Sequence, residues 1–441
     1  MSRHKAKPVS QTPVTVCVES LSHEGRGVAH VEGKAVFIDG ALPGETVRFV
    51  YSKRHKRHDE AKVQEVLTPS PQRVAARCEH FGVCGGCALQ HLEPEAQVQA
   101  KQQILLDSLR HLGKLEPLNV LAPLTGPHWH YRRKARLGVK YVLKKQRLMV
   151  GFRERSLSVV ADLQSCAILH PAIGARLNEL GELIRGLDAY DHIAQIEVAV
   201  GDNGAALVFR TMIVLEVADR ARLTEFGRTN ALQIYLQAGG PDSVTLLWPT
   251  TADLSYHLPE YQLDLHFSPT DFTQINADIN RALVHQVVEL LDPGADDAVL
   301  DLFCGLGNFT LPLARRAGTV VGVEGDAGLI RRAEENARLN GIGNARFHVS
   351  DLAADVSNAP WRKARYDKLL LDPPRIGALS LLPTIAKSDA RRIVYVSCNP
   401  ATLARDAGIL VHEHGYTLQS AGVVDMFPHT AHVESIALFE R

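Results

Sequence analysis

The chain has 441 residues and a formal net charge of zero, with 45% hydrophobic and 22% charged residues. This length exceeds what one hydrophobic core usually supports, so we expect a globular protein of two or three domains. No apolar run reaches membrane-spanning length and no secretory signal opens the chain, so we expect a cytoplasmic protein with a short disordered basic tail. Seven cysteines in such a chain argue against a disulfide framework.

Positive charge is concentrated in two segments. Residues 1–57 contain ten Lys and Arg against five Asp and Glu, and residues 127–156 contain ten against one. Separate basic segments in a neutral protein suggest that a polyanion binds on one face. The alternative is a solvated face of a sheet.

The hydrophobic patterns predict three kinds of architecture in chain order. Residues 13–68 are short alternating runs broken by Gly and Pro, which predict about five strands and a small OB-like β-barrel. Residues 95–112 predict a helix, and residues 129–262 predict mostly antiparallel strands interrupted by a helix near 171–187. From about residue 274 helices alternate with apolar strands, which predicts a doubly wound parallel α/β sheet.

A cysteine cluster lies between the first two regions. "CEHFGVCGGC" contains Cys78, Cys84 and Cys87, and Cys166 is the natural candidate for a fourth ligand. Thiolates at this spacing select zinc or an iron–sulfur cluster. The intervening glycines leave backbone N–H groups available to cluster sulfides, which favours iron–sulfur.

A glycine loop follows the first strand of the α/β region. "VLDLFCGLGNFTLPLA", residues 299–314, is an apolar strand, then Gly305 and Gly307, then a helix. Glycines at this point let a ligand approach the backbone at the carboxyl edge of the sheet. The loop is neither a G-x-G-x-x-G motif nor a phosphate-binding P-loop.

Acidic residues end the following strands. Glu324 comes 19 residues after Gly305, where a carboxylate can bind two ribose hydroxyls, and Asp351 and Asp372 end the next two strands. This series resembles class I S-adenosylmethionine-dependent methyltransferases. The alternative is a Rossmann-like domain that binds another nucleotide.

Cys398 ends a further strand in "RRIVYVSCNPATLARD", residues 391–406, and either is an inert core thiol or acts as a nucleophile. His429, His432 and Glu434 precede the last strand. A cysteine, a methyl donor and a base match methylation at C5 of a pyrimidine. A thiolate adds to C6, C5 attacks the methyl group, and a base then removes the C5 proton. This chemistry alone leaves uracil and cytosine both open.

With these motifs the chain resembles the RNA uracil-C5 methyltransferase family, most closely its 23S ribosomal RNA branch, over nearly its whole length. The resemblance implies an RNA-binding TRAM domain in residues 10–69, a central [4Fe-4S] domain in residues 70–262 and a methyltransferase domain in residues 263–441. It also implies a ligand set for the cluster, namely Cys78, Cys84, Cys87 and Cys166.

The same resemblance implies roles in the methyltransferase domain. Cys398 would be the nucleophile and Glu434 the base. The residues implied to bind S-adenosylmethionine are Gln274, Phe303, Asn308, Glu324, Asp351 and Asp372. The expected partner is 23S ribosomal RNA. Two alternatives stay open: the same chemistry on transfer RNA, and a non-catalytic RNA-binding iron–sulfur protein.

Overall fold

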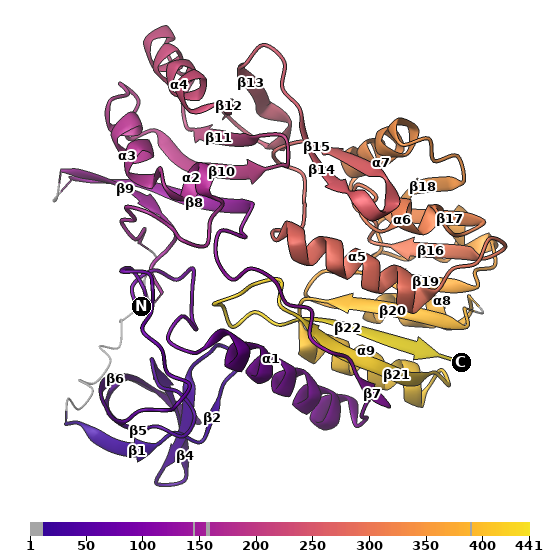
Figure 1. Ribbon diagram of the computed structural model, residues 1–441, viewed down its shortest axis with the longest axis horizontal. Coiled ribbons are helices and arrows are strands. Elements are labelled where there is room, and N and C mark those ends of the chain that lie inside the picture. Colours follow the sequence, from indigo (N-terminus) through magenta and orange to yellow (C-terminus); the bar gives the residue numbers. More distant parts are fainter. Residues whose placement is uncertain (1–11, 144–145, 156–158, 389) are drawn as a thin grey trace, which may run out of the picture. The chain divides into compact units, whose positions relative to one another are not determined.

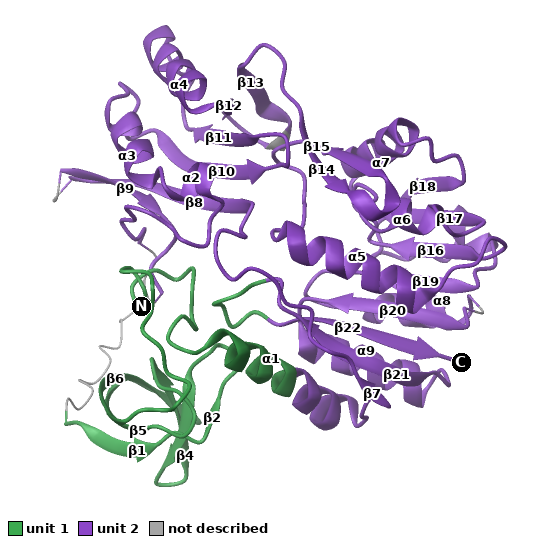
Figure 2. Ribbon diagram, in the orientation of Figure 1, with its two compact units in different colours: residues 1–104, 427–432 green, residues 105–426, 433–441 purple. Residues whose placement is uncertain are grey.

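The computed structural model describes residues 12–143, 146–155, 159–388 and 390–441. Residues 1–11 of the predicted basic tail, and Lys144 and Lys145 of the second basic segment, lie outside the described residues. The chain divides into two compact units (Figure 2). The first contains residues 1–104 and 427–432, and the second contains residues 105–426 and 433–441. None of the described helices is both long and apolar enough to cross a membrane.

A six-stranded β-barrel dominates the first unit (Figure 1). Its strand order is β1-β5-β6-β4-β3-β2. The strands are β1 Val14–Cys17, β2 Ser20–Leu21, β3 Gly27–Val31, β4 Lys34–Asp39, β5 Thr46–Arg54 and β6 His58–Thr68. Alternate residues face a core that includes Val36, Ile38 and Phe49, each fully buried. The barrel therefore confirms the predicted architecture and has one strand more than expected.

A long helix and a distant segment of the chain complete the first unit. α1 spans Pro94–Ser108 and passes into a π-helical turn, Leu109–Gly113, so the predicted helix is confirmed. The unit boundary falls within α1. Residues 427–432 bind to the early part of this helix: the buried Gln97 accepts a hydrogen bond from the His429 N–H, and Lys101 Nζ donates to Phe427 O.

The central sheet belongs to the second unit and has the order β13-β12-β11-β10-β8-β9. Only the β11–β12 pair is parallel, as expected for a mostly antiparallel region. Its strands are β8 Lys134–Val142, β9 Arg147–Gly151, β10 Ile193–Val200, β11 Ala205–Thr211, β12 Leu232–Gln237 and β13 Val244–Trp248. The helices around it are α2 Pro171–Gly174, α3 Leu177–Arg185, α4 Val217–Asn230 and the 3-10 turn Pro241–Ser243.

One helix of this region was not predicted. α4 has the sequence "VADRARLTEFGRTN", which is polar with few apolar positions, so hydrophobic periodicity does not reveal it. The parallel pairing of β11 and β12 requires a crossover, and α4 supplies it.

A separate hairpin follows the central sheet. β14, Leu254–Leu258, pairs antiparallel with β15, Leu263–Phe267, across the 3-10 turn Pro259–Tyr261. Asn336 of α7, Ala327–Leu339, and Asn340, the residue after that helix, accept hydrogen bonds from the backbone of β15. We therefore propose a boundary just before residue 254, because a boundary between 262 and 263 would divide this hairpin.

An eight-stranded sheet forms the core of the C-terminal region, in the order β18-β17-β16-β19-β20-β22-β21-β7. The first five strands are mutually parallel, and β22 is antiparallel to both of its neighbours. The strands are β7 Asn119–Val120, β16 Ala298–Leu302, β17 Thr319–Glu324, β18 Ala345–Val349, β19 Lys368–Leu371, β20 Arg392–Ser397, β21 Thr417–Val424 and β22 Glu434–Glu440. The predicted doubly wound sheet is thus confirmed, with one antiparallel strand inserted near its end.

Helices cover both faces of this sheet (Figure 1). Right-handed crossovers place α6 and α7 on one face and α8 and α9 on the other. The remaining elements are α5 Ala277–Leu291, α6 Thr310–Ala314, α8 Leu382–Ala386, α9 Pro400–His412 and the 3-10 turns Pro360–Lys363 and Leu379–Leu381. Strand order reverses around β16, and the carboxyl ends of strands at such a reversal are where doubly wound sheets bind their ligands.

Candidate functional site

The sequence-predicted residues of the C-terminal region meet at one edge of the sheet. β16 pairs with β17 at Leu302 and Val323 and with β19 at Leu302 and Leu371. β19 pairs in turn with β20 at Leu371 and Tyr395. The residues at the ends of these strands therefore emerge side by side; they are Phe303, Glu324, Asp372 and Cys398.

The glycine loop after β16 has an unusual backbone that holds space open. Phe303, Gly305 and Gly307 have φ angles of 69°, 56° and 96°. Phe303 donates its N–H to Val323 O at 2.8 Å, which fixes the start of the loop against β17. A Cβ atom added to Gly305 would meet no atom within 4 Å. The backbone at Gly305 is therefore accessible to a ligand, as the sequence predicts.

Glu324 is held at the centre of this edge by backbone donors. Its Oε2 accepts the Gly305 N–H at 3.2 Å, and its Oε1 accepts the N–H groups of Gly325 and Asp326 at 2.7 and 3.1 Å. Glu324 is half-buried, so its remaining lone pairs can reach a bound molecule. Two vicinal hydroxyl groups suit a carboxylate positioned in this way.

The other predicted cofactor residues differ in how they are held. The amide of Asn308 bonds to Asn280 through both of its polar atoms, at 2.9 Å each, and accepts from Tyr256 Oη at 2.8 Å. Asn308 therefore fixes the hairpin and α5 around the loop. Gln274 is half-buried just before α5, and Asp351 is exposed after β18, where it accepts the Ala353 N–H.

Buried carboxyl groups give this edge its electrostatic character. Asp301 in β16 is fully buried, and burial raises its pKa to about 7 although Thr310 Oγ1 donates to it. Asp372 is partly exposed, yet protein surrounds its carboxyl group enough that burial, aided by Glu324, raises its pKa to about 7. A cationic ligand at this edge would stabilise the ionised forms of both groups.

Cys398 and Glu434 lie opposite one another. β20 and β22 run antiparallel and pair Ser397 with Ser435. Beyond this pair, Cys398 follows β20 and Glu434 is the first residue of β22. Residues opposite one another on neighbouring strands project to the same face of the sheet. Ser435 Oγ also donates to Ser397 O at 3.1 Å, which ties the two strands together beside the pair.

The thiol and the carboxyl groups affect one another's protonation. Burial, together with the carboxylates of Glu434 and Asp372, raises the pKa of Cys398 to about 11, while Arg375 acts in the opposite direction. Glu434 is 5% exposed, and burial followed by the charge of Asp372 raises its pKa well above the usual range. Ionisable groups that perturb one another in this way are typical of a catalytic site.

The loop after Asp372 is anchored by residues that the sequence reasoning missed. Asp406 in α9 accepts hydrogen bonds from the Ala378 N–H at 2.8 Å and from Tyr395 Oη at 2.7 Å. Asn399 Nδ2 and Thr402 Oγ1 donate to Arg375 O at 3.0 and 3.2 Å. The sequence offered one signal for Asp406, which is a charged residue among the apolar positions of α9. Asp301 gives the same signal in β16.

The predicted cluster ligands fall in two places. Cys78, Cys84 and Cys87 lie in one loop of the first unit, where the Gly86 N–H donates to Cys84 Sγ at 3.4 Å and the Cys78 N–H donates to Gln90. Cys166 lies in the second unit, between β9 and α2, and its N–H donates to Gly174 O. All four are partly exposed.

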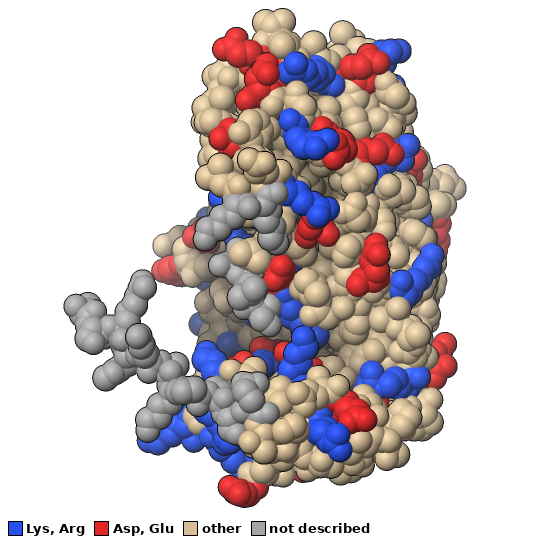
Figure 3. All heavy atoms as spheres, turned by 90° about the vertical axis from the view of Figure 1, so that its left-hand side faces the viewer, with Lys and Arg blue, Asp and Glu red and all other residues tan. Residues whose placement is uncertain are grey.

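The two basic segments differ in how their charges are used. In the barrel, the end of β5 and the turn that follows it carry the exposed side chains of Lys53, Lys56 and Arg57, whereas Arg54 pairs with the buried Asp59. Figure 3 shows Lys and Arg side chains gathered at the lower end of the face that it presents. In the central sheet, by contrast, several cations are paired within the protein.

The paired cations of the central sheet include two from the second basic segment. Arg133 bonds to Asp202 at 2.5 Å, and Asp202 also binds Arg281 of α5. Lys134 donates to the backbone of Asp271 and Pro269, and its burial lowers its pKa to about 8. These side chains connect the central sheet to the residues around α5.

The fold and the arrangement at the sheet edge define a class of protein, the S-adenosylmethionine-dependent methyltransferases. A family model described as tRNA (Uracil-5-)-methyltransferase matches residues 255–441, and a TRAM domain model matches residues 12–48. A solved structure, the tRNA (uracil-54, C5)-methyltransferase of Pyrococcus abyssi in complex with S-adenosyl-L-homocysteine, shares the fold with a TM-score of 0.74 and 23% identity. The match covers 97% of this chain and 100% of that chain.

Full-length relatives identify the family. The 23S rRNA (uracil(1939)-C(5))-methyltransferase RlmD of Methylococcus capsulatus is 54% identical over 440 residues, covering 100% of this chain and 99% of the relative. Its counterpart in Nitrosococcus oceani is 55% identical over 444 residues, with the same coverage. The chain belongs to the RlmD family of 23S rRNA uracil-C5 methyltransferases. The predicted family and branch are thus confirmed, and with them the assignment as a methyltransferase enzyme.

Proposed function

We propose that this protein transfers a methyl group from S-adenosylmethionine to C5 of one uridine in 23S ribosomal RNA. The uridine is the one at position 1939 that the names of its relatives specify. The observation that supports this mechanism best is the opposition of Cys398 and Glu434 across β20 and β22. A nucleophile and a base on the same face of one sheet edge can act on adjacent ring atoms of a single pyrimidine.

The proposed reaction begins with addition of the Cys398 sulfur to C6 of the uracil. The new C–S bond makes C5 nucleophilic, and C5 then forms a bond to the methyl group. S-Adenosylmethionine would supply that methyl group from its sulfonium, whose methyl–sulfur bond breaks as S-adenosylhomocysteine leaves with the electron pair. Glu434 removes the proton from C5, the C6–S bond breaks, and the thiolate of Cys398 is regenerated.

The described residues fit the proposed cofactor. The open space at Gly305 admits a ligand to the backbone, and the carboxylate of Glu324 stands where it can accept hydrogen bonds from a ribose. Asp372 and Phe303 lie at the same sheet edge, with Gln274 and Asp351 as further proposed contacts. Asn308 would act mainly by holding the loop, because its amide is bonded to Asn280 and Tyr256.

The mechanism is tested by trapping the covalent intermediate. Glu434→Gln keeps the shape of the side chain and removes its basicity, so it should transfer the methyl group and stall as a protein–RNA adduct. Cys398→Ala should form neither adduct nor product. The measurement is a denaturing gel with radiolabelled RNA and S-adenosylmethionine. Normal turnover by Glu434→Gln, with no retarded band, would remove Glu434 from the mechanism and point to His429 or His432.

Transfer RNA is the second candidate substrate, because the family model that matches residues 255–441 is described by that activity. Methylation of purified 23S ribosomal RNA and of transfer RNA, each lacking the modification, separates the two. We expect methylation of ribosomal RNA only. A reaction confined to transfer RNA would overturn the substrate assignment and leave the chemistry at Cys398 intact.

We further propose that Cys78, Cys84, Cys87 and Cys166 hold a [4Fe-4S] cluster. Four thiolates suit such a cluster, and the Gly86 N–H directed at Cys84 Sγ is the kind of donor that stabilises anionic sulfur. Anaerobically purified protein should be brown and contain about four irons per chain. Cys166→Ala should lose both colour and iron, whereas Cys17→Ala, in β1 of the barrel, should keep them. A colourless protein with one zinc ion would favour the alternative of a zinc site.

A ribosomal RNA substrate also gives the remaining features a role. The TRAM domain and the exposed cations of the barrel would contact phosphates, as an RNA-binding module does. An enzyme acting on ribosomal RNA would work in the cytoplasm. The division into barrel, central and methyltransferase domains, with the hairpin from residue 254 placed in the last, is part of this proposal.

A further inference from the structure

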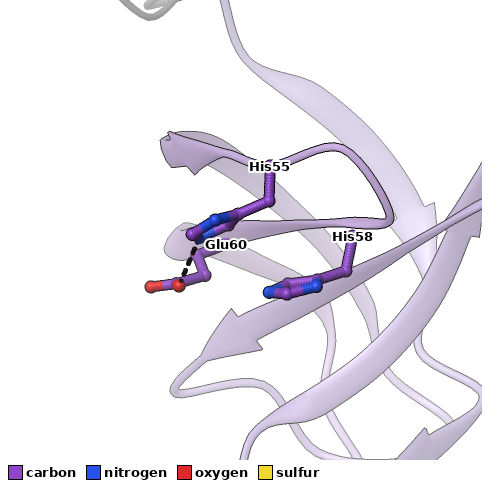
Figure 4. Close-up of side chains that lie close together, drawn as sticks. All are labelled: His55, His58 and Glu60. Carbon is purple, nitrogen blue, oxygen red and sulfur yellow. Dashed lines mark hydrogen bonds and ion pairs between the residues drawn. The ribbon is translucent and has the colours of Figure 1, made fainter. Parts of the chain in front are cut away.

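Three potential metal ligands converge at one end of the barrel, remote in sequence from the predicted cysteine ligands. They are His55 in the turn after β5, and His58 and Glu60 at the start of β6. One ligand atom from each lies within 4.8 Å of the other two. Figure 4 shows the three side chains projecting to the same side of the hairpin, with the ring of His55 bonded to Glu60.

The positions of these side chains are set by the surrounding barrel. The imidazoles of His55 and His58 stack with centroids 4.5 Å apart and an interplanar angle of 26°. The ring of Phe37 packs edge-on against His58 at 5.4 Å. The His55 N–H donates to the buried Asp59, and Lys34 Nζ donates to His55 O. The hairpin therefore presents its two imidazoles together before any ligand binds.

We propose that His55, His58 and Glu60 form a binding site for a divalent transition-metal ion, with zinc as the best match. Two imidazoles and one carboxylate are a common protein ligand set for zinc, with bonds of roughly 2.0–2.2 Å. Tetrahedral bonds of that length separate the ligand atoms by roughly 3.4 Å. The three ligand atoms already lie within 4.8 Å of one another, so the proposal requires them to come closer by about 1.4 Å at most.

The contacts of Glu60 leave one oxygen for the metal. Its Oε1 faces His55 Nε2 at 2.8 Å, and its Oε2 lies 3.6 Å from Arg26 Nη1. A metal ion replaces the proton between His55 and Oε1, while Arg26 orients the carboxylate through Oε2. His55 and Glu60 have side chains 28% and 32% exposed, so solvent can supply a fourth ligand.

The charges near the site are partly neutralised. Lys34 and Arg54 both bind the buried carboxylate of Asp59, at 2.7 and 2.9 Å. Lys56 and Arg57, in the turn between the two histidines, are exposed and project charge toward solvent. A bound ion would fix this turn by linking both of its ends, and would thereby hold the exposed cations in one arrangement.

The experiment is a zinc titration by calorimetry of the full-length chain without an affinity tag, after dialysis against a chelator. The variants are His58→Gln and Glu60→Gln, and the matched control is His30→Gln. His30 pairs with Glu19 at 2.8 Å in the same barrel and offers only two ligand groups. The cysteines are the same in every variant, so metal bound by them appears equally in all titrations.

We expect the wild type and His30→Gln to bind one zinc ion more than His58→Gln or Glu60→Gln does. In His58→Gln and Glu60→Gln the affinity for this ion should fall by more than about 100-fold. Loss of a residue that only hydrogen-bonds to a metal ligand costs roughly 10- to 100-fold, and these variants lose a ligand itself. Zinc should also raise the melting temperature of the wild type more than that of His58→Gln. Equal zinc stoichiometry in wild type and both site variants, or an equal loss in His30→Gln, would overturn the proposal.

Discussion

Cys398 combines a nucleophile's position with a protonation state that opposes reaction. It directly follows β20 at the site edge, yet burial and the neighbouring carboxylates raise the pKa of its thiol to about 11. The thiolate is the reactive form of cysteine. In the free protein, only a small fraction of Cys398 is therefore ionised near neutral pH. Cationic charge placed beside Asp372 and Glu434 would offset these carboxylates and lower the pKa of the thiol.

This argument predicts how fast Cys398 is alkylated. In the free protein, alkylation by iodoacetamide should rise about tenfold per pH unit and level off only near pH 11, because the folded protein holds the proton up to the raised pKa. Sinefungin, which carries an ammonium group in place of the sulfonium, should shift the profile to lower pH. Neutral S-adenosylhomocysteine should not. The modified Cys398 peptide is quantified by mass spectrometry.

Two results would contradict that prediction. One is rapid alkylation of the free protein at pH 7, which would mean that the thiol is already ionised. The other is an equal shift with sinefungin and S-adenosylhomocysteine, which would attribute the change to conformation rather than charge.

At the scale of elements, a single glutamine joins three segments of the first unit. Gln97 in α1 donates to Leu89 O and Leu92 O at 3.0 and 2.7 Å and accepts the His429 N–H at 2.8 Å. The N–H groups of Ala88 and Leu89, next to Cys87, donate in turn to His429 O. The cysteine loop therefore holds residues 427–432, the segment that leads to Glu434 in β22.

Removing this connection should slow the proton removal that we propose for Glu434. Gln97→Ala removes the side-chain partner of two backbone groups, Leu92 O and the His429 N–H, at a cost of about 1–3 kcal/mol each, so the segment should lose its fixed position. We expect the variant to accumulate the covalent protein–RNA adduct in single-turnover reactions and to bind S-adenosylmethionine normally. Gln99→Ala, on the exposed side of the same helix, is the control and should behave as wild type. Unchanged adduct kinetics in Gln97→Ala would show that the segment is held in place by other interactions.

At the scale of the whole molecule, RNA binding requires positive charge that is not already used by the fold. The net charge of zero hides this distinction, because Arg133 and Lys134 are committed to contacts around α5 while Lys56 and Arg57 are exposed. Charge reversal at Arg133 would damage the fold and would say little about RNA. The exposed turn of the barrel gives the cleaner test.

Reversing Lys56 and Arg57 to Glu should weaken RNA binding and reduce its salt dependence. The magnitude of the negative slope of log binding constant against log salt concentration becomes smaller by about 1 for each phosphate that the protein no longer neutralises. We therefore expect this magnitude to be smaller by about 2 in the variant. The control reverses Arg185 and Arg228, exposed residues of α3 and α4 that pair with Glu182 and Glu225. Affinity is measured by filter binding at several salt concentrations, with S-adenosylmethionine binding measured in parallel. An identical slope in the barrel variant and wild type would exclude phosphate binding by this turn.

Local patterns in the sequence were sufficient for the architecture and for the candidate reacting residues. Alternating and helical hydrophobic periods predicted the barrel and the doubly wound sheet because each pattern buries one face of one element. The strand-to-loop positions of Gly305, Glu324 and Cys398 were readable because the carboxyl ends of parallel strands share one edge. The polar helix α4 was missed because it carries little of the periodicity on which such predictions depend.

The sequence by itself therefore determined the family, and it predicted the order of domains and the candidate catalytic groups, all of which depend on contiguous motifs. The tertiary structure decided which distant residues lie side by side. It paired Cys398 with Glu434 through the register of β20 and β22, tied Gln97 to His429, and separated structural cations from exposed ones. These arrangements depend on strand register and on packing between segments far apart in the chain, which no local pattern encodes.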